Sequence, residues 1–482
     1  MNYILKDREP KAVLHYFEEI SQIPRGSGNE KAIADYLVDF AEKRNLYVYR
    51  DELNNVFIRK NASKGFENSQ PILLQGHTDM VCEKNMDKQH DFLKDPIELV
   101  VDGDYLRANS TTLGADDGVA VAYMLALLDS DNIAHPTLEC LLTSGEEVGM
   151  IGAIGFDTNQ ITAKRMLNLD SDNEHEILCG SAGDARITIK KEFTKINAKG
   201  KCVTLKVWGL SGGHSGTEIN LEKGNANKIM ARILFAAEKI AKINIAEIFG
   251  GSKDNAIPRE CVASIFVDDS KYAEVKLAME NMVKDIAAEL EDSDKGLKLE
   301  ITEDKKFDKM IDDKSSSEII SILKLLPNGV RANSMALKGL VVASNNIGVI
   351  VMNNDYLEIY SLSRSSVASL LFSVVDEIEL ISQTFGATPI RASQCPGWKY
   401  AVNSPLRDLC VKIYKELNAS EPSVIAIHAG LECGLFKSKI PELDVVSNGP
   451  YCKDIHTPDE RLDLKSLERV WQFLIKVLSQ LK

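Results

Sequence analysis

Five side chains that commonly bind metal ions lie at the ends of apolar segments in this sequence. They are the imidazoles of His77 and His456 and the carboxylates of Asp116, Glu147 and Asp170. Two imidazoles and three carboxylates match two Zn²⁺-like ions that share one bridging carboxylate and leave a position open for water. The sequence therefore predicts a metal-dependent hydrolase.

Two acidic residues beside these ligands could support the chemistry. Asp79 lies two residues after His77, and residues two apart in a strand face the same side, so Asp79 could bond the second ring nitrogen of His77. Glu146 directly precedes Glu147. Because a catalytic metal ion lowers the pKa of its water to about 7, a nearby carboxylate such as Glu146 suffices as the general base.

Each candidate ligand also has a purely structural interpretation. Asp116 could cap a helix, the paired glutamates could be a solvated run of charge, and His77 and His456 could be strand-end or loop residues. Asp170, however, ends an apolar segment, where an uncompensated buried charge would be costly. Taken together, the five residues favour metal binding, with Asp116 as the bridging ligand.

Composition narrows the class of protein and its partners. At 482 residues the chain is long for one hydrophobic core, so two domains are expected. Acidic residues outnumber basic ones by 71 to 57, which disfavours nucleic acid as a partner. The most apolar stretch, residues 118–128, is too short to cross a bilayer, and the first residues lack the pattern of a secretory signal, so no membrane partner is expected.

The number and spacing of the cysteines predict the cellular compartment of the protein. The nine cysteines are scattered, odd in number and free of any Cys-x-x-Cys pair. This pattern predicts neither a disulfide framework nor a thiolate zinc site. A reducing cytoplasm is therefore the expected location.

Alternating helical and strand patterns occupy the first part of the chain. Helices are predicted at 11–22, 28–44 and 117–129, and strands at 46–50, 55–59, 71–75, 137–142 and 165–170. This alternation predicts an α/β fold in which a sheet is flanked by helices. Ligands are expected at the ends of its strands.

A different pattern begins near residue 187. Predicted there are strands at 201–208, 261–267, 347–353 and 356–363, and helices at 224–243, 271–291, 316–325 and 366–384. The α/β pattern resumes near residue 400, with helices at 405–417 and 465–481 and strands at 424–427 and 443–447. We therefore expect a discontinuous catalytic domain of residues 1–186 and 400–482, with residues 187–399 inserted as an α+β lid domain.

The ordered motifs resemble those of the M20 metallopeptidases, and most closely the aminoacyl-histidine dipeptidases. The matching motifs are His77-Thr-Asp79, Gly114-Ala-Asp-Asp117, Glu146-Glu147, Asp170, and Gly449-Pro450 followed by His456. The resemblance covers essentially the whole chain, in motif order and in spacing. It implies a zinc-peptidase-like catalytic domain with a central mixed sheet flanked by helices, together with an inserted lid.

The resemblance also implies the cofactors and their ligands. Two Zn²⁺ per chain are expected, and Mn²⁺ or Co²⁺ are possible substitutes. The implied ligand sets are His77, Asp116 and Asp170 for one ion, and Asp116, Glu147 and His456 for the other. Glu146 is implied as the general base and Asp79 as the residue that orients His77, and a cis peptide is expected after Asp116.

Four residues match substrate-binding positions of the family. The resemblance implies that His214 supports the oxyanion, that Asn255 and Arg364 hold the carboxylate end of the substrate, and that Gly430 makes a backbone contact. A planar guanidinium suits this role because it can bind both carboxylate oxygens. Structural interpretations are a loop histidine, a turn asparagine, a surface arginine and a turn glycine.

The predicted activity is hydrolysis of dipeptides with a free amino terminus, of the Xaa-His or β-Ala-His type, by a hydroxide that bridges two metal ions. The enzyme is expected to be a monomer or a homodimer. Alternatives within the family are a tripeptide aminopeptidase and an N-acyl amino acid deacylase. Alternatives outside it are a non-catalytic metal-binding scaffold and a serine hydrolase, since Gly209-Leu-Ser211-Gly-Gly213 formally fits the Gly-x-Ser-x-Gly elbow.

Overall fold

The computed structural model describes residues 3–337 and 339–482, which form two compact units. Unit 1 contains the described residues up to Gly180 together with Tyr400–Ala426 and Leu431–Lys482. Unit 2 contains Ser181–Lys399, without residue 338, and the short segment Ile427–Gly430.

Unit 1 is built around a mixed sheet with the strand order β1-β2-β6-β3-β7-β23-β8-β22. Strand β3 runs parallel to both β6 and β7, and β7 runs parallel to β23, whereas β1, β2 and β6 pair antiparallel. The strands are β1 (Tyr47–Arg50), β2 (Val56–Lys60), β3 (Ile72–His77), β6 (Leu138–Thr143), β7 (Arg165–Asn168), β8 (Glu176–Ser181), β22 (Ser423–Ile427) and β23 (Asp444–Ser447). A separate sheet contains β4 (Leu99–Asp102), β5 (Tyr105–Ala108), β24 (Cys452–Lys453) and β25 (Arg461–Asp463).

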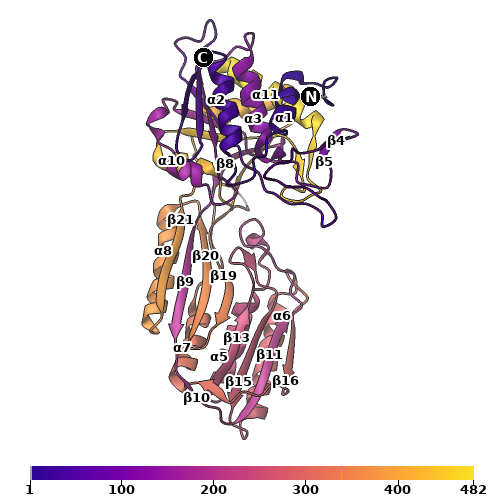
Figure 1. Cartoon of the computed structure of the whole chain (residues 1–482). Helices are drawn as coiled ribbons and strands as arrows, with labels where there is room; N and C mark the ends of the chain where they lie inside the picture. Colours follow the sequence, from indigo (N-terminus) through magenta and orange to yellow (C-terminus); the bar gives the residue numbers. More distant parts are fainter. Residues whose placement is uncertain (1–2, 338) are drawn as a thin grey trace. The chain divides into compact units, whose positions relative to one another are not determined.

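Helices surround the main sheet of unit 1 (Figure 1). They are α1 (Lys11–Ile20), α2 (Lys31–Glu42), α3 (Ala115–Asp129), α4 (Ile151–Gly155), α9 (Pro405–Asn418), α10 (Glu432–Lys439) and α11 (Leu464–Gln480), with a 3-10 turn at Thr158–Gln160. Nearly every residue of α3 is buried, because α1 and β3 pack against it. Gly76 permits this approach, since a Cβ there would lie 2.3 Å from Asp117 Oδ2 and 2.4 Å from the Cβ of Ala120.

Unit 2 contains an antiparallel sheet with the order β16-β11-β15-β13-β19-β20-β9-β21, and β18 also pairs with β19. Its strands are β9 (Gly183–Glu192), β11 (Lys201–Trp208), β13 (Ile243–Gly250), β15 (Cys261–Val267), β16 (Lys298–Thr302), β18 (Gly329–Asn333), β19 (Val341–Met352), β20 (Tyr356–Ser365) and β21 (Thr388–Cys395). Strands β13 and β19 meet through the single register pair of Gly250 and Ile350. The sheet therefore consists of two halves joined at one point.

The helices of unit 2 cover its sheet. They are α5 (Ala226–Glu238), α6 (Tyr272–Glu289), α7 (Asp313–Leu325) and α8 (Ala368–Thr384), with a 3-10 turn at Ile219–Leu221. Helix α8 packs along β9, β20 and β21 (Figure 1). Two small ribbons pair β10 (Lys195–Asn197) with β17 (Lys309–Ile311), and β12 (Gly213–His214) with β14 (Ala256–Ile257). Within the described ranges, none of the helices combines the length and apolar character that a membrane crossing requires.

The α/β class and the central mixed sheet flanked by helices are confirmed. The main error in the predicted elements concerns residues 224–243, where the helix ends at Glu238 and β13 starts at Ile243. The apolar residues after the helix belong to a strand in which most side chains are buried. Helical periodicity alone could not detect this change, because both elements present apolar side chains to the same core.

Candidate metal centre

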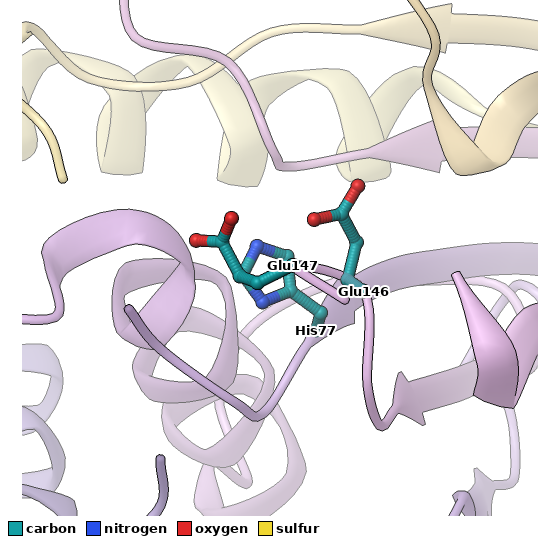
Figure 2. Close-up of side chains that lie close together, drawn as sticks. All are labelled: His77, Glu146 and Glu147. Carbon is teal, nitrogen blue, oxygen red and sulfur yellow. The ribbon is translucent and has the colours of Figure 1, made fainter. Parts of the chain in front are cut away.

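Three of the five predicted ligands lie at the carboxyl ends of three neighbouring strands of unit 1. His77 is the last residue of β3 and is paired in register with Thr143, the last residue of β6. Glu147 follows β6, and Asp170 follows β7, the parallel neighbour of β3 on its other side. Because parallel strands end at the same edge of a sheet, these side chains converge. Figure 2 shows two glutamate carboxylates of this edge near the His77 ring.

Asp116 connects the two predicted ligand sets. It lies at the start of α3, where the backbone is not helical and the peptide bond to Asp117 is cis. One carboxylate oxygen, Oδ1, lies 3.0 Å from Nε2 of His77, and the other, Oδ2, lies 3.1 Å from Nε2 of His456. A single carboxylate therefore faces both imidazoles.

The five predicted ligands form two groups of three that share Asp116. The ligand atoms of each group lie within 4.8 Å of one another. The groups are His77, Asp116 and Asp170, and Asp116, Glu147 and His456. A third combination joins His77 to Glu146 and Glu147, whereas the nearby acid Asp172 belongs to none of these groups.

The charges in these groups fit divalent cations. Burial alone would lower the pKa of His77, but Asp116 and Asp79 raise it well above its usual value. Contacts with Asp116 and Glu147 raise the pKa of His456 to about 10. Each imidazole thus lies among carboxylates that favour a positive charge. Oε1 of Glu147 is buried and lies 2.9 Å from Nε2 of His456, so a carboxylate oxygen and a ring nitrogen face each other at the position of a candidate cation.

Asp79 holds both His77 and the loop that follows β6. Its Oδ1 lies 3.4 Å from Nδ1 of His77, and the ring nitrogen also lies 3.1 Å from the Asp79 carbonyl. The Asp79 carboxylate accepts hydrogen bonds from the amides of Glu146 and Glu147 at 3.1 and 3.3 Å, and from the hydroxyl of Ser27 at 2.8 Å. One fully buried carboxylate therefore fixes the His77 ring and the backbone that carries Glu146, the predicted base, and Glu147, a predicted ligand.

Glu146 lies in an environment that favours its protonated form. Burial raises the pKa of Glu146 to about 8, and the nearby carboxylates of Glu432, Glu147 and Asp116 act in the same direction, whereas His77 opposes them. A carboxyl group with a pKa near neutrality can both accept and return a proton. This arrangement can support general acid and base chemistry next to the ligands.

Two residues that sequence reasoning missed hold the turn before α3. Glu460 is 2% exposed, and its carboxylate accepts hydrogen bonds from the amides of four consecutive residues, 113 to 116, at 2.7, 3.0, 2.8 and 3.4 Å. The guanidinium of Arg25, which is equally buried, donates to the carbonyls of Thr78, Asp79 and Gly114. Neither side chain bonds the side chain of a predicted ligand, but together they fix the backbone that carries Asp116 and Asp79.

Replacing Glu460 by glutamine is expected to weaken metal binding by about 10- to 100-fold, the usual effect of losing an outer partner of a ligand. The amide keeps the size of the side chain but has one accepting oxygen for four N–H groups. Calorimetric titration of metal into the metal-free protein measures the change. Glu468→Gln, which alters an exposed residue of α11, is the control and should bind metal as tightly as the wild type. If Glu460→Gln binds metal as tightly as Glu468→Gln, this role of Glu460 is contradicted.

The four predicted substrate residues all belong to unit 2. His214 lies in β12, whose ribbon with β14 brings it beside Asn255, and the Asn255 carbonyl accepts a hydrogen bond from the amide of Ser215. Nδ1 of His214 accepts from the amides of Gly216 and Thr217 at 3.3 and 3.1 Å. Burial, followed by the charge of Arg364, lowers the pKa of His214. The neutral ring therefore carries its proton on Nε2, where it is free to donate.

Arg364 is a buried arginine rather than the surface residue of the structural interpretation. It is 6% exposed, and its Nε has no hydrogen-bond partner among the described residues. In the sheet it lies between Ser344 of β19 and Asp184 of β9. Burying a guanidinium without full pairing is costly, so an anionic ligand would stabilise it.

Gly430 belongs to the segment Ile427–Gly430, which also contains a buried histidine that sequence reasoning missed. Nε2 of His428 lies 2.7 Å from the hydroxyl of Ser344. Burial and the charge of Arg364 lower the pKa of His428 to about 3, so its ring is neutral. The contact fastens the four-residue segment to β19.

The serine-hydrolase alternative lacks the required geometry. Ser211 follows β11 in an exposed loop, and its amide donates to the carboxylate of Asp294. The loop leads into the β12 ribbon and a short 3-10 turn rather than into a helix. The sharp strand-to-helix turn of a nucleophile elbow is therefore missing at this motif.

Two groups of candidate metal ligands at the edge of a mixed α/β sheet, with one carboxylate shared between them, are typical of metal-dependent hydrolases with paired ions. Comparison with known proteins narrows this class. The model of peptidase family M20/M25/M40 matches residues 73–480. The chain belongs to this family and is a metallopeptidase.

Individual relatives extend the likeness over nearly the whole chain. The cytosol non-specific dipeptidase of Escherichia coli (strain K12) is 38% identical over 479 residues, which cover 99% of both chains. The crystal structure of an aminoacylhistidine dipeptidase from Vibrio alginolyticus is similar with a TM-score of 0.94 and 33% identity, covering 98% of this chain and 97% of that one. The aminopeptidase PepT from Bacillus cereus, with 16% identity and a TM-score of 0.57, shares the fold.

Proposed function

We propose that this protein is a metallodipeptidase that hydrolyses dipeptides with a free amino terminus at a pair of divalent cations. The observation that carries the proposal is the position of Asp116, whose two carboxylate oxygens each face a different imidazole. A carboxylate in this position suits a ligand shared by two ions. The relatives named as dipeptidases support the choice of substrate class.

We assign two Zn²⁺ to the two ligand groups, with Mn²⁺ or Co²⁺ as substitutes. The assignment is His77, Asp116 and Asp170 for one ion, and Asp116, Glu147 and His456 for the other. When bound, the two ions supply a nucleophilic water with a pKa of about 7 and polarise the carbonyl of the scissile bond. Asp79 keeps the His77 ring in the orientation that leaves Nε2 for the metal.

Glu146 is proposed as the general base and acid. Its carboxylate accepts a proton from the attacking water and returns it to the leaving amine. The amides of Glu146 and Glu147 donate to Asp79, and these two hydrogen bonds keep the Glu146 carboxylate at the strand ends. Its raised pKa supports proton exchange in both directions.

Residues of unit 2 are proposed to bind the substrate, with unit 2 acting as a lid. His214 would donate from Nε2 to the oxygen that gains charge as the carbonyl is attacked, since Nδ1 is already an acceptor of backbone N–H groups. Asn255 and Gly430 would contact the substrate's backbone. The protein is proposed to act as a monomer or as a homodimer.

Arg364 is proposed to bind the terminal carboxylate of the dipeptide. Replacing Arg364 by lysine is expected to raise KM for dipeptides by about 10- to 100-fold, the range of a lost charged hydrogen bond of 1.5–3 kcal/mol. A lysine keeps the charge but cannot form the planar two-oxygen contact. Steady-state kinetics measure the change, and the C-terminal amides of the same dipeptides serve as the control. The wild type and Arg364→Lys should both cleave these amides poorly and with similar KM. If the substitution raises KM for the amides as much as for the free dipeptides, the assignment is contradicted.

Preference for Xaa-His or β-Ala-His dipeptides is the finer part of the proposal. Similarity to the aminoacylhistidine dipeptidase of Vibrio alginolyticus supports this preference, whereas the Escherichia coli relative is a non-specific dipeptidase. A cytoplasmic location is supported by the word cytosol in the name of that relative and by nine cysteines that are all free.

A panel of substrates tests the proposal. Purified protein with added Zn²⁺, Mn²⁺ or Co²⁺ should cleave free dipeptides, including β-Ala-His, and should reject N-acetyl and N-succinyl analogues and longer peptides. Cleavage of blocked analogues would indicate a deacylase, cleavage of tripeptides alone a tripeptide aminopeptidase, and no cleavage by the metal-loaded protein a scaffold. Activity should be lost with chelators and kept in Ser211→Ala, which separates it from a serine mechanism.

A further inference from the structure

Glu432 is a buried acid whose position none of the roles above requires. It belongs to the motif Ile427-His-Ala-Gly-Leu-Glu432, of which only Gly430 has a proposed part in substrate binding. Glu432 is the first residue of α10 in unit 1, and its side chain is fully buried. A fully buried glutamate is rare unless a cation or a network of donors compensates its charge.

Glu432 completes a layer of polar side chains beneath the predicted ligands. Its Oε2 accepts hydrogen bonds from the amide of Gln75 and from the hydroxyl of Thr143, the latter at 2.7 Å. Gln75 in turn accepts a hydrogen bond from Asn168 at 2.7 Å. These three residues lie on the adjacent strands β3, β6 and β7, and all of them are buried.

The spacing along each strand relates this layer to the metal centre. Gln75 lies two residues before His77, and Asn168 lies two residues before Asp170. Residues two apart in a strand face the same side, so the polar layer lies directly behind the ligands on the same face. The amide of Asp170 also donates to the side-chain oxygen of Asn168 at 3.3 Å.

The hydrogen bonds leave the charge of Glu432 uncompensated. Its donors are neutral, and Oε1 has no hydrogen-bond partner among residues 3–337 and 339–482. No lysine or arginine of these ranges forms an ion pair with it. Burial raises its pKa to about 7, and Asp170 and Asp79 act in the same direction, whereas the nearby His77 and the hydrogen bond from Thr143 act in the opposite one. In the metal-free chain, burial therefore disfavours the charged form of the Glu432 carboxylate.

We propose that Glu432 is a buried counter-charge for the metal pair. It acts through its negative charge rather than as a ligand, and the hydrogen bonds from Gln75 and Thr143 hold its carboxylate in place. The proposal rests on the proposed function, because it requires cations at the adjacent ligand groups. Bound cations at that edge would supply positive charge beyond that of His77, since no lysine or arginine of the described ranges pairs with Glu432. The buried charge of Glu432 therefore destabilises the metal-free protein and increases its affinity for the metal ions.

The substitution Glu432→Gln separates charge from shape. Glutamine retains the size and one oxygen that can accept from Gln75 and Thr143. The metal-free variant is expected to melt at the same temperature as the wild type or at a higher one, since a buried charge has been removed. Its metal affinity is expected to be about 10- to 100-fold weaker, as for other groups that support a ligand shell.

Thermal melting in chelator and calorimetric metal titration give both readouts without any substrate. A structural glutamate would instead lower the melting temperature of metal-free and metal-loaded protein alike and leave the affinity unchanged, which would overturn the proposal. Failure of Glu432→Gln to fold without metal would overturn it as well, because the proposal requires a metal-free form at least as stable as the wild type.

A second variant tests the charge itself. Thr143→Val removes one hydrogen bond to Glu432 but keeps the carboxylate, so it should lower stability while changing metal affinity by less than about threefold, well below the effect of a lost support group. An equal loss of affinity in both variants would assign the effect to the hydrogen bonds and overturn the counter-charge. If the substrate panel shows no hydrolysis while these affinities behave as expected, the proposed function fails and the counter-charge stands.

Discussion

Glu146→Gln is expected to lower kcat by about 10³-fold, within the range of 10² to 10⁴ that a general base contributes. The amide occupies the same volume but can neither accept the proton of the attacking water nor return it to the leaving amine. Glu146 belongs to neither of the two groups that share Asp116, so both metal ions should stay bound. The measurement combines steady-state kinetics with elemental analysis of the purified variant.

The neighbouring glutamate provides a matched control for this experiment. Glu147→Gln makes the same chemical change one residue along, in a side chain whose Oε1 lies 2.9 Å from Nε2 of His456. This variant should lose metal as well as activity, whereas Glu146→Gln should lose activity alone. A Glu146→Gln enzyme with nearly normal kcat would show that another group moves the proton.

Asp116→Ala is expected to weaken metal binding at both positions by more than about 100-fold, which exceeds the loss for an outer partner of a ligand. The reason is geometric, since the two oxygens of Asp116 lie 3.0 and 3.1 Å from the two imidazoles and belong to both groups. Every other predicted ligand belongs to one group of that pair. Metal titration, followed by assays at saturating metal, should show that hydrolysis is not restored.

Asp172→Asn is the control for the shared carboxylate. Asp172 lies near the centre, where burial raises its pKa and Asp116 adds to the effect, but it belongs to none of the candidate groups. Its substitution should leave two metal ions bound. Loss of only one ion in Asp116→Ala would contradict the shared position and favour two separate sites.

Most strands of the main sheet of unit 1 could be predicted from the sequence alone, and the structure brings the five predicted ligands together in two groups. The strands that end in His77 or lead into Asp170 are recognisable as apolar runs, because parallel strands are buried on both faces. Their carboxyl ends are the expected place for ligands, because ligands bind at that edge of such sheets. The helix α3 was also predictable, since it is apolar over its whole length. These features depend on patterns within short segments.

The residues that support the centre could not be predicted in the same way. Glu460 meets the turn at residues 113–116 across about 345 positions of sequence, and Glu432 meets Gln75 across 357. Arg25 has no local pattern that distinguishes it from a surface arginine, although it is 2% exposed. Their roles depend on long-range contacts, which spacing and periodicity do not reveal.

The segment Ile427–Gly430 belongs to unit 2, although the chain on both sides of it belongs to unit 1. This connectivity limits how the two units can be produced as separate fragments. The chain passes from one unit to the other after Gly180, Lys399, Ala426 and Gly430. A fragment that ends at Lys399 would leave Ser344 without its imidazole partner. The two units therefore cannot be excised as independent modules by cutting at two points, and exchange of one unit between relatives would have to carry this short loop with it.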